Sequence, residues 1–391
     1  KQIPLEALFS NPVLRELAEF IDSYTKSSTL PVAQVDYESL SPLSLAQRRL
    51  WIVDALADKK DTYILSTIVS LDFIVDIDVL RTTVSHLIDR HSSLRTLFVT
   101  VDSEPYQKVS DELSPPVLVI ERDNSSYELD NCSLHQLFEA FPLTWSLVDG
   151  PLFYVLVLND PHGKAFVCLK FHHIISDGVS VKIFTDEMLL VYNNLLHSRR
   201  WDIGLSALNL QYRDYAIWQY DWNRSEKFSK DLEFWSSLLS GRLSKIDFVR
   251  THGSSVSLTQ AHSFDSRIGP SILKRIRILA KRCKTSTFNV FLTLFGLYIS
   301  RLCGETCVNV GTPVTGRTVD DLQNVIGFFV NLLVYPLTID ERHSLYEQVL
   351  SVSSLGKEIF SHQNIQFEQL VSKISPDRDE AGQPLFQVML V

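Results

Sequence analysis

The sequence lacks the features that mark several large classes of protein. Positive charge is in deficit, with 37 Lys and Arg against 46 Asp and Glu and a formal net charge of -9. This balance argues against a nucleic-acid-binding domain, which needs a basic face. No apolar run approaches the ~18 residues that a membrane-spanning helix requires, and no secretory signal opens the chain. We therefore expect a cytoplasmic protein with neither nucleic-acid nor membrane partners.

Cysteine is also scarce, with five residues in the chain, an odd number. We interpret them as reduced, mostly buried thiols. Cys303 and Cys307 are four residues apart and would share one face of a helix, but the intervening Gly304-Glu305-Thr306 is typical of a turn. No second cysteine pair accompanies them, so we expect no metal site.

An initiator methionine is absent too, and the chain opens on an amphipathic segment. Within residues 4–22, Leu14, Leu17 and Ile21 recur at helical spacing. A helix of this length cannot bury its apolar stripe alone. Residues 23–38 are polar, contain proline and show no periodicity, which is typical of a linker. We expect the chain to be a piece of a larger protein.

From about residue 40 the composition and periodicity of the sequence are typical of a globular α/β protein. Hydrophobic residues make up 45% and charged residues 21%, an ordinary composition, and a prior of roughly 150 residues per domain suggests two or three units. The periodicities predict helices over 46–56, 78–90, 179–196, 272–281, 287–300 and 344–362, and strands over 67–73, 97–101, 152–158, 165–171, 307–314 and 328–337. Two α/β halves flank a middle rich in Trp and Tyr, which indicates two lobes with a connector.

Candidate chemistry gathers where the strand 165–171 ends. His172 and His173 follow it, and side chains alternate faces along a strand. Only one of the two can then face a given cavity, and the pair cannot easily share a metal ion. A buried Asp177 would need a partner, and Gly178 permits the backbone angles that a turn before the next helix can require. Taken alone, the histidines are equally well explained as ordinary core or surface residues.

Further motifs extend along the rest of the chain. In one-letter code they are SLAQRRLW (44–51), RHSSLRTLF (90–98), FHHIISDGVS (171–180), YRDYAIWQ (212–219), GTPVTGRT (311–318), IGFFVN (326–331), HQNIQFE (362–368) and PLFQV (384–388). In this order they resemble the motifs of the condensation domains of non-ribosomal peptide synthetases. These domains belong to the HHxxxDG superfamily, which includes chloramphenicol acetyltransferase-like enzymes. The last two runs fit less closely, and residues 377–383 also depart from the family pattern, which puts local loops in doubt more than catalysis.

The resemblance implies a fold and a domain order. The fold would be α/β, with two chloramphenicol-acetyltransferase-like lobes in a V-shaped pseudo-dimer and the active-site tunnel between them. The domains would be the C-terminal helices of an upstream peptidyl carrier protein (1–22), a linker (23–38), an N-terminal lobe (39–208) and a C-terminal lobe (209–391). Relative to the family, the C-terminal lobe stops early, after the strand-like residues 386–391.

The resemblance also implies a reaction in secondary-metabolite biosynthesis. The α-amine of an aminoacyl thioester on the downstream carrier would attack the aminoacyl or peptidyl thioester on the upstream carrier, forming an amide. The domain itself would bind no cofactor, because both substrates are carried on 4'-phosphopantetheine arms. An adenylation domain would be adjacent, and a carrier directly upstream suggests an L-configured donor. A dual epimerisation and condensation domain is one alternative.

The family motif makes His173 the tunnel-facing catalytic residue and His172 a structural one. His173 would act as a general base or as a hydrogen-bonding group that positions the amine or the oxyanion. An α-amine of pKa about 7.7–8.0 is already partly neutral at cytoplasmic pH, so orientation, which can supply ~7–11 kcal/mol, is a strong contender. Asp177 would pair with Arg317 of the second lobe in a buried, architectural ion pair. Gly178 would open the helix start toward the substrate or simply form a turn.

Four further residues are weaker candidates for the tunnel or the substrate: Ser176, Asn331, Arg90 and Arg95. Arg90 could instead complement a helix dipole as part of the scaffold, and Arg95 has a similar alternative. Asn331 lies on an apolar run, where a polar side chain needs a hydrogen-bonding reason.

Other functions fit the sequence less well. Epimerisation domains usually carry Trp where Val181 stands, and their second-lobe glutamate could not be located. Heterocyclisation domains replace the histidines with aspartates. A carrier-independent acyltransferase conflicts with the carrier-like opening segment, and a catalytically silent recruitment module conflicts with an intact His173 and Asp177.

Overall fold

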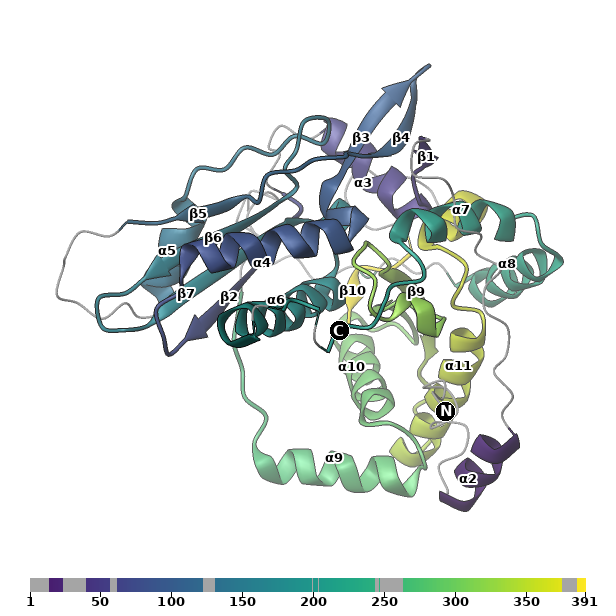
Figure 1. The fold of residues 1–391 in the computed structure, drawn as a ribbon. Helices are drawn as coiled ribbons and strands as arrows, with labels where there is room; N and C mark the ends of the chain where they lie inside the picture. The colour runs from purple at the N-terminus through teal and green to yellow at the C-terminus, as the bar shows by residue number, and fades with distance from the viewer. Residues whose placement is uncertain are drawn as a thin grey trace, which may run out of the picture. The chain divides into compact units, whose positions relative to one another are not determined.

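The computed structural model describes residues 14–23, 40–56, 62–121, 131–198, 200–202, 204–242, 246, 263–374 and 385–391; Figure 1 shows the elements. The chain divides into two compact units. The N-terminal unit consists of residues 28–225 together with 315–330, and the C-terminal unit consists of 226–314 and 331–391 with the opening segment 1–27. This division differs from the two predicted lobes in two ways. The boundary falls after Ser225 and not after residue 208, and residues 315–330 belong to the N-terminal unit.

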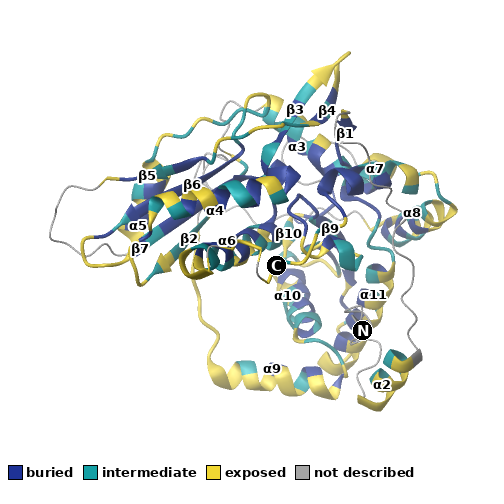
Figure 2. Cartoon of the chain, in the orientation of Figure 1, coloured by how far each residue is buried: buried dark blue, intermediate teal, exposed yellow. Residues whose placement is uncertain are grey.

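The N-terminal unit is built on a four-stranded sheet in the order β2-β7-β6-β5. The strands are β2 (Ile64–Leu71), β7 (Ala165–His172), β6 (Phe153–Asn159) and β5 (Val117–Val119), and only the β5–β6 pair is parallel. Alternate residues of β6 enter different cores. Val155 and Val157 pack with α4 (Ile77–Arg90) and α6 (Gly178–Ser198), whereas Leu156 and Leu158 pack with α5 (Asn131–Ala140). Both faces are therefore covered, and β6 is buried from Phe153 to Leu158 (Figure 2).

Smaller elements complete this unit. A second sheet has the order β1-β4-β3, and short 3-10 turns and helices flank it. The elements are β1 (Ser41–Pro42), α3 (Leu45–Leu56), η1 (Ser92–Arg95), β3 (Thr96–Val101), β4 (Glu104–Val109), η2 (His173–Ile175), α7 (Tyr212–Trp222) and η3 (Asp320–Leu322). The side chain of Asp214 accepts a hydrogen bond from the Gln211 backbone N–H at 2.8 Å, which fixes the start of α7.

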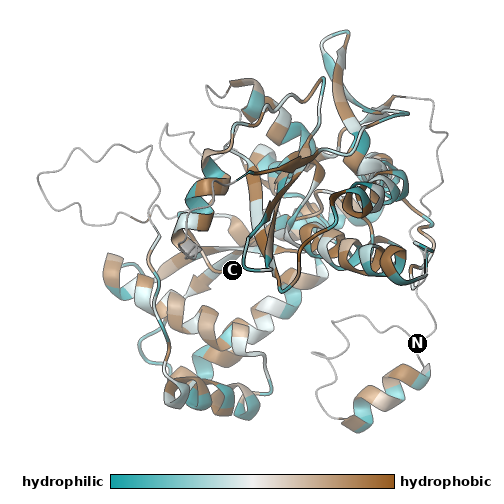
Figure 3. Cartoon of the chain, turned by 60° about the vertical axis from the view of Figure 1, so that its left-hand side comes forward, coloured by the Kyte–Doolittle hydropathy of each residue, from teal (hydrophilic) through white to brown (hydrophobic). Residues whose placement is uncertain are grey.

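The C-terminal unit has a three-stranded sheet in the order β10-β8-β9. Its elements are α8 (Glu226–Leu239), α9 (Pro270–Arg282), α10 (Thr287–Cys303), β8 (Cys307–Val314), β9 (Asn331–Thr338), α11 (Leu345–Ser361), α12 (Phe367–Ile374) and β10 (Val388–Met389). Local sequence sets the helix ends: Ser286 and Ser344 cap α10 and α11, and Gly304 ends α10 at φ 73°. The opening segment contributes the helix α2 (Leu14–Ser23), along which hydrophobic and hydrophilic residues alternate (Figure 3).

Every predicted helix and strand from residue 46 onward has a counterpart, with ends that differ by a few residues. One strand start is wrong. The strand expected from Phe328 begins at Asn331, because the Phe329 N–H donates to Asp177 instead of joining the sheet. The turn expected after Cys303 is present. The linker 23–38 and residues 377–383 lie outside the described residues, apart from Ser23, which ends α2.

Two tests on the described part of the chain concern membranes and metals. No single helix there is long and apolar enough to cross a membrane; α9 and α10 reach the required length and composition only as a pair bent by 109°. Within the same residues, no group of three or more His, Cys, Asp or Glu side chains could hold a metal ion.

Candidate active site

The two adjacent histidines occupy different local structures. His172 is the last residue of β7, and His173 is the first residue of the 3-10 turn η2. The His173 N–H donates to the Tyr63 carbonyl at 2.8 Å, so the backbone pairing continues one residue beyond the strand. His172 is only 1% exposed, whereas His173 is half-buried. Of the pair, His173 is therefore the side chain with access to a reacting group.

Hydrogen bonds give the two rings opposite tautomers when both are neutral. The Nδ1 of His173 lies 2.7 Å from the carbonyl oxygen of Ser176. A carbonyl only accepts, so Nδ1 carries the proton and Nε2 holds the lone pair. In His172, Nδ1 accepts from the Ile174 N–H at 3.2 Å, which places the proton on Nε2, 3.8 Å from a carboxylate oxygen of Asp54. His173 can thus offer Nε2 as a proton or hydrogen-bond acceptor.

The ring of His173 is also held from the side. It packs against Phe328, with ring centroids 4.6 Å apart. The turn beneath it is fixed by the Gln47 amide, which donates to the Ile174 carbonyl at 3.1 Å. The orientation of the His173 ring therefore depends on packing against Phe328 and on the Ser176 carbonyl, while Gln47 holds the main chain of the turn.

Asp177 is the centre of a buried polar cluster. Its side chain is 0% exposed. Oδ1 accepts from the Ser180 N–H at 2.7 Å and from the Arg317 guanidinium at 3.1 Å, while Oδ2 accepts from the Phe329 N–H at 3.0 Å. The structure thus brings together Asp177 and Arg317, which are 140 residues apart. Both belong to the N-terminal unit, because segment 315–330 packs there and not with the second predicted lobe.

Arg317 is held at several points besides Asp177. One terminal nitrogen donates to the Leu322 and Val325 carbonyls at 2.8 and 2.5 Å, and the guanidinium carbon lies 4.1 Å from the centroid of the Phe329 ring. Burial lowers the pKa of Arg317, and the charge of Asp177 opposes that shift. The Ser180 hydroxyl also accepts from Arg317, at 2.8 Å. Sequence reasoning missed Ser180, although its place three residues after Asp177 is the usual position for a bond at a helix start.

The opening motif and α7 brace the same region. The Tyr212 hydroxyl donates to the Phe328 carbonyl at 2.7 Å, so the Ser44 hydroxyl, also 2.7 Å away, must be the donor to Tyr212. Burial raises the pKa of Tyr212 well above its usual range, and the phenol stays neutral. The sequence indicated a packing role for Tyr212 but gave no signal for this chain of hydroxyls.

Gly178 begins α6 and does not have a positive φ, so the turn does not need glycine for its backbone angle. A Cβ added there would meet no atom within 4 Å in the described structure. The residue leaves the helix start open. Ser176, the neighbouring candidate, is fully buried, and its hydroxyl donates to the Asp177 carbonyl at 3.4 Å.

The two candidate arginines make contacts that favour the scaffold alternative. Arg90 donates from two nitrogens to the carboxylate of Glu187, at 3.0 and 3.2 Å. The same carboxylate lies 2.8 Å from Nε2 of His91. Burial alone would raise the pKa of Glu187, but His91 and Arg90 outweigh it and hold that pKa low. Arg95 donates to the Ser110 carbonyl at 2.5 Å.

Asn331 is engaged in the C-terminal unit. Its amide nitrogen donates to the Gln363 and Ile365 carbonyls at 2.9 and 2.7 Å, and its oxygen accepts from the N–H groups of Leu332 and Phe367 at 2.9 and 3.1 Å. Three of the four bonds hold the connection between α11 and the start of α12, and the bond from Leu332 lies within β9. The contacts favour a structural role for Asn331 over the predicted tunnel role, because the amide is saturated by main-chain partners.

Comparisons with known proteins bear on these motifs. The family model described as "Condensation domain" matches residues 37–391. The chain belongs to the condensation-domain family. Members of this family in non-ribosomal peptide synthetases catalyse peptide-bond formation, an acyl transfer. The match begins two residues before the predicted start at residue 39.

The condensation domain is similar to parts of much larger bacterial proteins. It is 29% identical to Surfactin synthase subunit 2 of Bacillus subtilis (strain 168) over 392 residues, which covers 100% of this chain and 10% of that protein. It is 29% identical to Tyrocidine synthase 3 of Brevibacillus parabrevis, covering 99% of this chain and 6% of that protein. The chain therefore spans a tenth or less of these relatives, and the matched region includes the segment before residue 37.

Solved structures share the fold of the condensation domain. The condensation domain of the Monacolin K polyketide synthase MokA matches with a TM-score of 0.74 and 20% identity, covering 90% of this chain and 81% of that one. The X-domain from teicoplanin biosynthesis matches with a TM-score of 0.75 and 19% identity, covering 92% and 78%. The predicted α/β, chloramphenicol-acetyltransferase-like fold is confirmed.

Proposed function

We propose that this condensation domain forms an amide bond between two carrier-bound thioesters. The donor would be an L-configured aminoacyl or peptidyl thioester on an upstream peptidyl carrier protein. The acceptor would be the α-amine of an aminoacyl thioester on a downstream carrier, and the donor's phosphopantetheine thiol would leave. The single observation that carries the proposal is the hydrogen bond from Nδ1 of His173 to the Ser176 carbonyl, within a chain of this family.

That bond determines what His173 can do. With the proton on Nδ1, the lone pair of Nε2 is free to accept a hydrogen bond from the attacking amine, which aligns the amine nitrogen for attack. If the amine loses its proton during bond formation, the same atom can receive it and pass it to the leaving thiolate. Both mechanisms use one ring orientation, and His172, with the opposite tautomer and nearly complete burial, would serve the scaffold.

Asp177 and Arg317 would act as positioning residues. Asp177 accepts the Phe329 N–H, and the neighbouring Phe328 ring packs on His173. The ion pair is therefore connected to the catalytic ring through two adjacent residues of segment 315–330. Gly178 would keep the helix start open to substrate.

The opening segment supports the choice of partners. Residues 1–36 precede the family match, yet the relatives match from the start of the chain. We propose that residues 1–22 end an upstream carrier protein, that 23–38 form a linker, and that an adenylation domain is adjacent. Phosphopantetheine arms on the two carriers would deliver the substrates, and the complex would work in the cytoplasm.

One competing function has an observation in its favour. The X-domain from teicoplanin biosynthesis has a solved complex with OxyB, and it matches this chain with a TM-score of 0.75. A domain with this fold can therefore form a complex with a partner protein, which is what a recruitment function would require. A dual epimerising domain and a carrier-independent acyltransferase remain further alternatives from the sequence.

The test is a single-turnover assay. The chain with its upstream carrier, loaded with an aminoacyl donor, is mixed with a loaded downstream carrier, and intact-protein mass spectrometry follows the dipeptidyl thioester. We expect product from the wild type and a loss of at least 100-fold in His173→Ala, within the roughly 10²–10⁴-fold range of acid–base groups. His172→Ala, tested as a folded control, should keep more activity. No dipeptide from correctly loaded wild-type partners contradicts the proposal and favours recruitment.

A second variant separates the two mechanisms of His173. His173→Gln places an amide oxygen near the position of Nε2, where it can accept a hydrogen bond but cannot act as a base at neutral pH. If positioning dominates, Gln restores at least tenfold over Ala. If proton transfer dominates, Gln and Ala are equally slow.

A further inference from the structure

The C-terminal unit contains a cavity of about 390 Å³. Its walls come from the turn before α10 and the start of that helix, from the end of β8, from Tyr335 in β9, and from α11. The volume falls within the roughly 300–1,000 Å³ of small-molecule sites. None of the residues considered above as catalytic or substrate-binding lines it, so the cavity is a separate feature.

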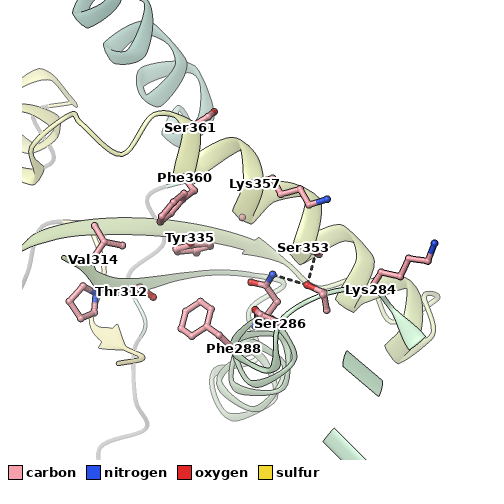
Figure 4. A pocket seen from close by; sticks show the side chains of 14 residues that line it. Lys284, Ser286, Phe288, Thr312, Val314, Tyr335, Ser353, Lys357, Phe360 and Ser361 are labelled. Carbon is pink, nitrogen blue, oxygen red and sulfur yellow. Dashed lines mark hydrogen bonds between the residues drawn. The ribbon is translucent and has the colours of Figure 1, made fainter. Parts of the chain in front are cut away.

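The interior of the cavity is apolar and aromatic. Phe288, Tyr335, Phe360 and Val314 form the wall that Figure 4 shows. The rings of Phe288 and Tyr335 meet edge to face with centroids 6.4 Å apart, which holds both in place. Gly356 leaves one side open, since a Cβ there would only reach ordinary van der Waals contact with Asn289 at 3.5 Å and with Tyr335 at 3.7 Å. Such a wall fits a hydrocarbon chain or an aromatic ring.

Positive charge stands at the edge of the cavity. Among the described residues, Lys284 and Lys357 are the charged ones that line the cavity, and no acidic one does. Figure 4 shows both lysine side chains directed away from the ring of Tyr335. Ser286 also lines the cavity and caps the 17-residue helix α10, whose N-terminus adds a partial positive charge. The edge therefore favours an anion.

We propose that this cavity binds a small amphipathic anion, a carboxylate with an apolar chain of medium length. The chain would lie against the aromatic wall, and the carboxylate would face Lys284 and Lys357. The site lies within the C-terminal unit alone and goes beyond the proposed amide-forming function.

The experiment measures binding of decanoate to the full chain by isothermal titration calorimetry, without carriers, below the concentration at which decanoate aggregates. We expect saturable 1:1 binding, at least tenfold tighter than that of decanol or decyltrimethylammonium. The double variant Lys284→Gln/Lys357→Gln should lose at least tenfold in affinity. The matched double variant Lys274→Gln/Lys281→Gln, which alters exposed lysines of α9, should bind as the wild type does.

Two substitutions of Gly356 locate the ligand in the cavity. Gly356→Leu projects a side chain into the space and should abolish binding, whereas Gly356→Ala adds only a Cβ and should retain it. The Lys284/Lys357 double variant, which changes exposed side chains, provides a second test if the Leu variant does not fold. Equal binding of decanoate and decanol, binding unchanged in folded Gly356→Leu or in the Lys284/Lys357 double variant, or no saturable binding to the wild type would each overturn the proposal. A failed condensation assay would leave this result unaffected.

Discussion

Asp177 in the N-terminal unit and Asn331 in the C-terminal unit are each the centre of a buried polar cluster, and the two centres differ in charge. Asp177 in the N-terminal unit is an ion that meets a second ion, Arg317, across 140 residues of sequence. Asn331 in the C-terminal unit is neutral, and its four partners are main-chain groups. Both centres hold segments beside family motifs in place. Removing one member of the ion pair leaves the other charge buried and unpaired. Removing the Asn331 side chain loses only the hydrogen bonds of a single amide.

The largest expected effect follows from removing one charge of the ion pair. Asp177→Ala leaves Arg317 buried without its counter-ion, and it also leaves the Phe329 N–H without its acceptor. We expect the free energy of unfolding to fall by about 3–5 kcal/mol, measured by urea denaturation. The double variant Asp177→Ala/Arg317→Met should cost less than the sum of the two single variants, because no charge is stranded.

Activity distinguishes this structural role from a catalytic one. If Asp177→Ala retained normal stability but lost all condensation activity, the architectural interpretation of Asp177 would be wrong. The comparison of the two centres would then also fail, since Asp177 would be retained for chemistry and not for folding.

A second substitution tests the turn that delivers Arg317 to the ion pair. Gly316 has φ 63°, and a Cβ there would lie 1.9 Å from the Phe329 carbonyl oxygen. Gly316→Ala should therefore lower the unfolding free energy by about 2–4 kcal/mol, from the backbone angle and the clash together. Gly163 has φ 86°, but a Cβ added there would meet no atom within 4 Å. Gly163→Ala therefore measures the cost of the positive backbone angle without a steric clash. Equal costs at the two positions would show that segment 315–330 adjusts freely.

Asn331→Ala should have a smaller effect than either change in the N-terminal unit. The variant removes four hydrogen bonds but strands no charge, and water can reach part of the connection after α11, where Gln363 is half-buried. We expect a loss of about 2 kcal/mol, measured by urea denaturation, with faster proteolysis between residues 362 and 367. A loss as large as that of Asp177→Ala would remove the distinction between a charged and a neutral centre.

The sequence predicts more of the Asp177 centre than of the Asn331 centre. The sequence predicts the pairing of Asp177 with Arg317 because both residues lie in motifs that resemble those of the family. Asn331 was recognised only as a polar residue that needed a reason, since its partners are carbonyls and N–H groups of residues 332–367, and main-chain groups carry no sequence signal. The same limit applies to the Ser176 carbonyl that sets the tautomer of His173.

Element positions were predictable wherever periodicity decided them, as in β6, β7 and α6. The exception at Phe328 is informative, because Phe328–Val330 is as apolar as a strand should be. Its main chain bonds Tyr212 and Asp177 instead of a neighbouring strand. An apolar pattern indicates that a segment is buried but not which residues it packs against. The sequence therefore could not show that segment 315–330 belongs to the N-terminal unit.

The smallest expected effect concerns a second charged centre of the N-terminal unit, formed by Arg90, His91 and Glu187. Burial lowers the pKa of His91 below the ordinary 6.5, with Glu187 opposing the shift. The unfolded chain then binds more protons than the folded one below about pH 6.5, so stability should decrease as pH falls through that value. The lowered pKa of Glu187 adds a further loss below its ordinary 4.5.

Replacing His91 by Asn removes the titration and keeps a side-chain donor for Glu187. The slope of unfolding free energy against pH between 6.5 and 5 should become shallower by up to about 1.4 kcal/mol per pH unit, the value for one proton. His135 is exposed on α5, so His135→Asn should leave the slope unchanged. An unchanged slope in His91→Asn would mean that this centre tolerates a protonated imidazole beside Arg90. The cost of stranding a charge at the Asp177–Arg317 pair would then come from the complete enclosure of that site. It would not be a general cost of burying charged groups in the N-terminal unit.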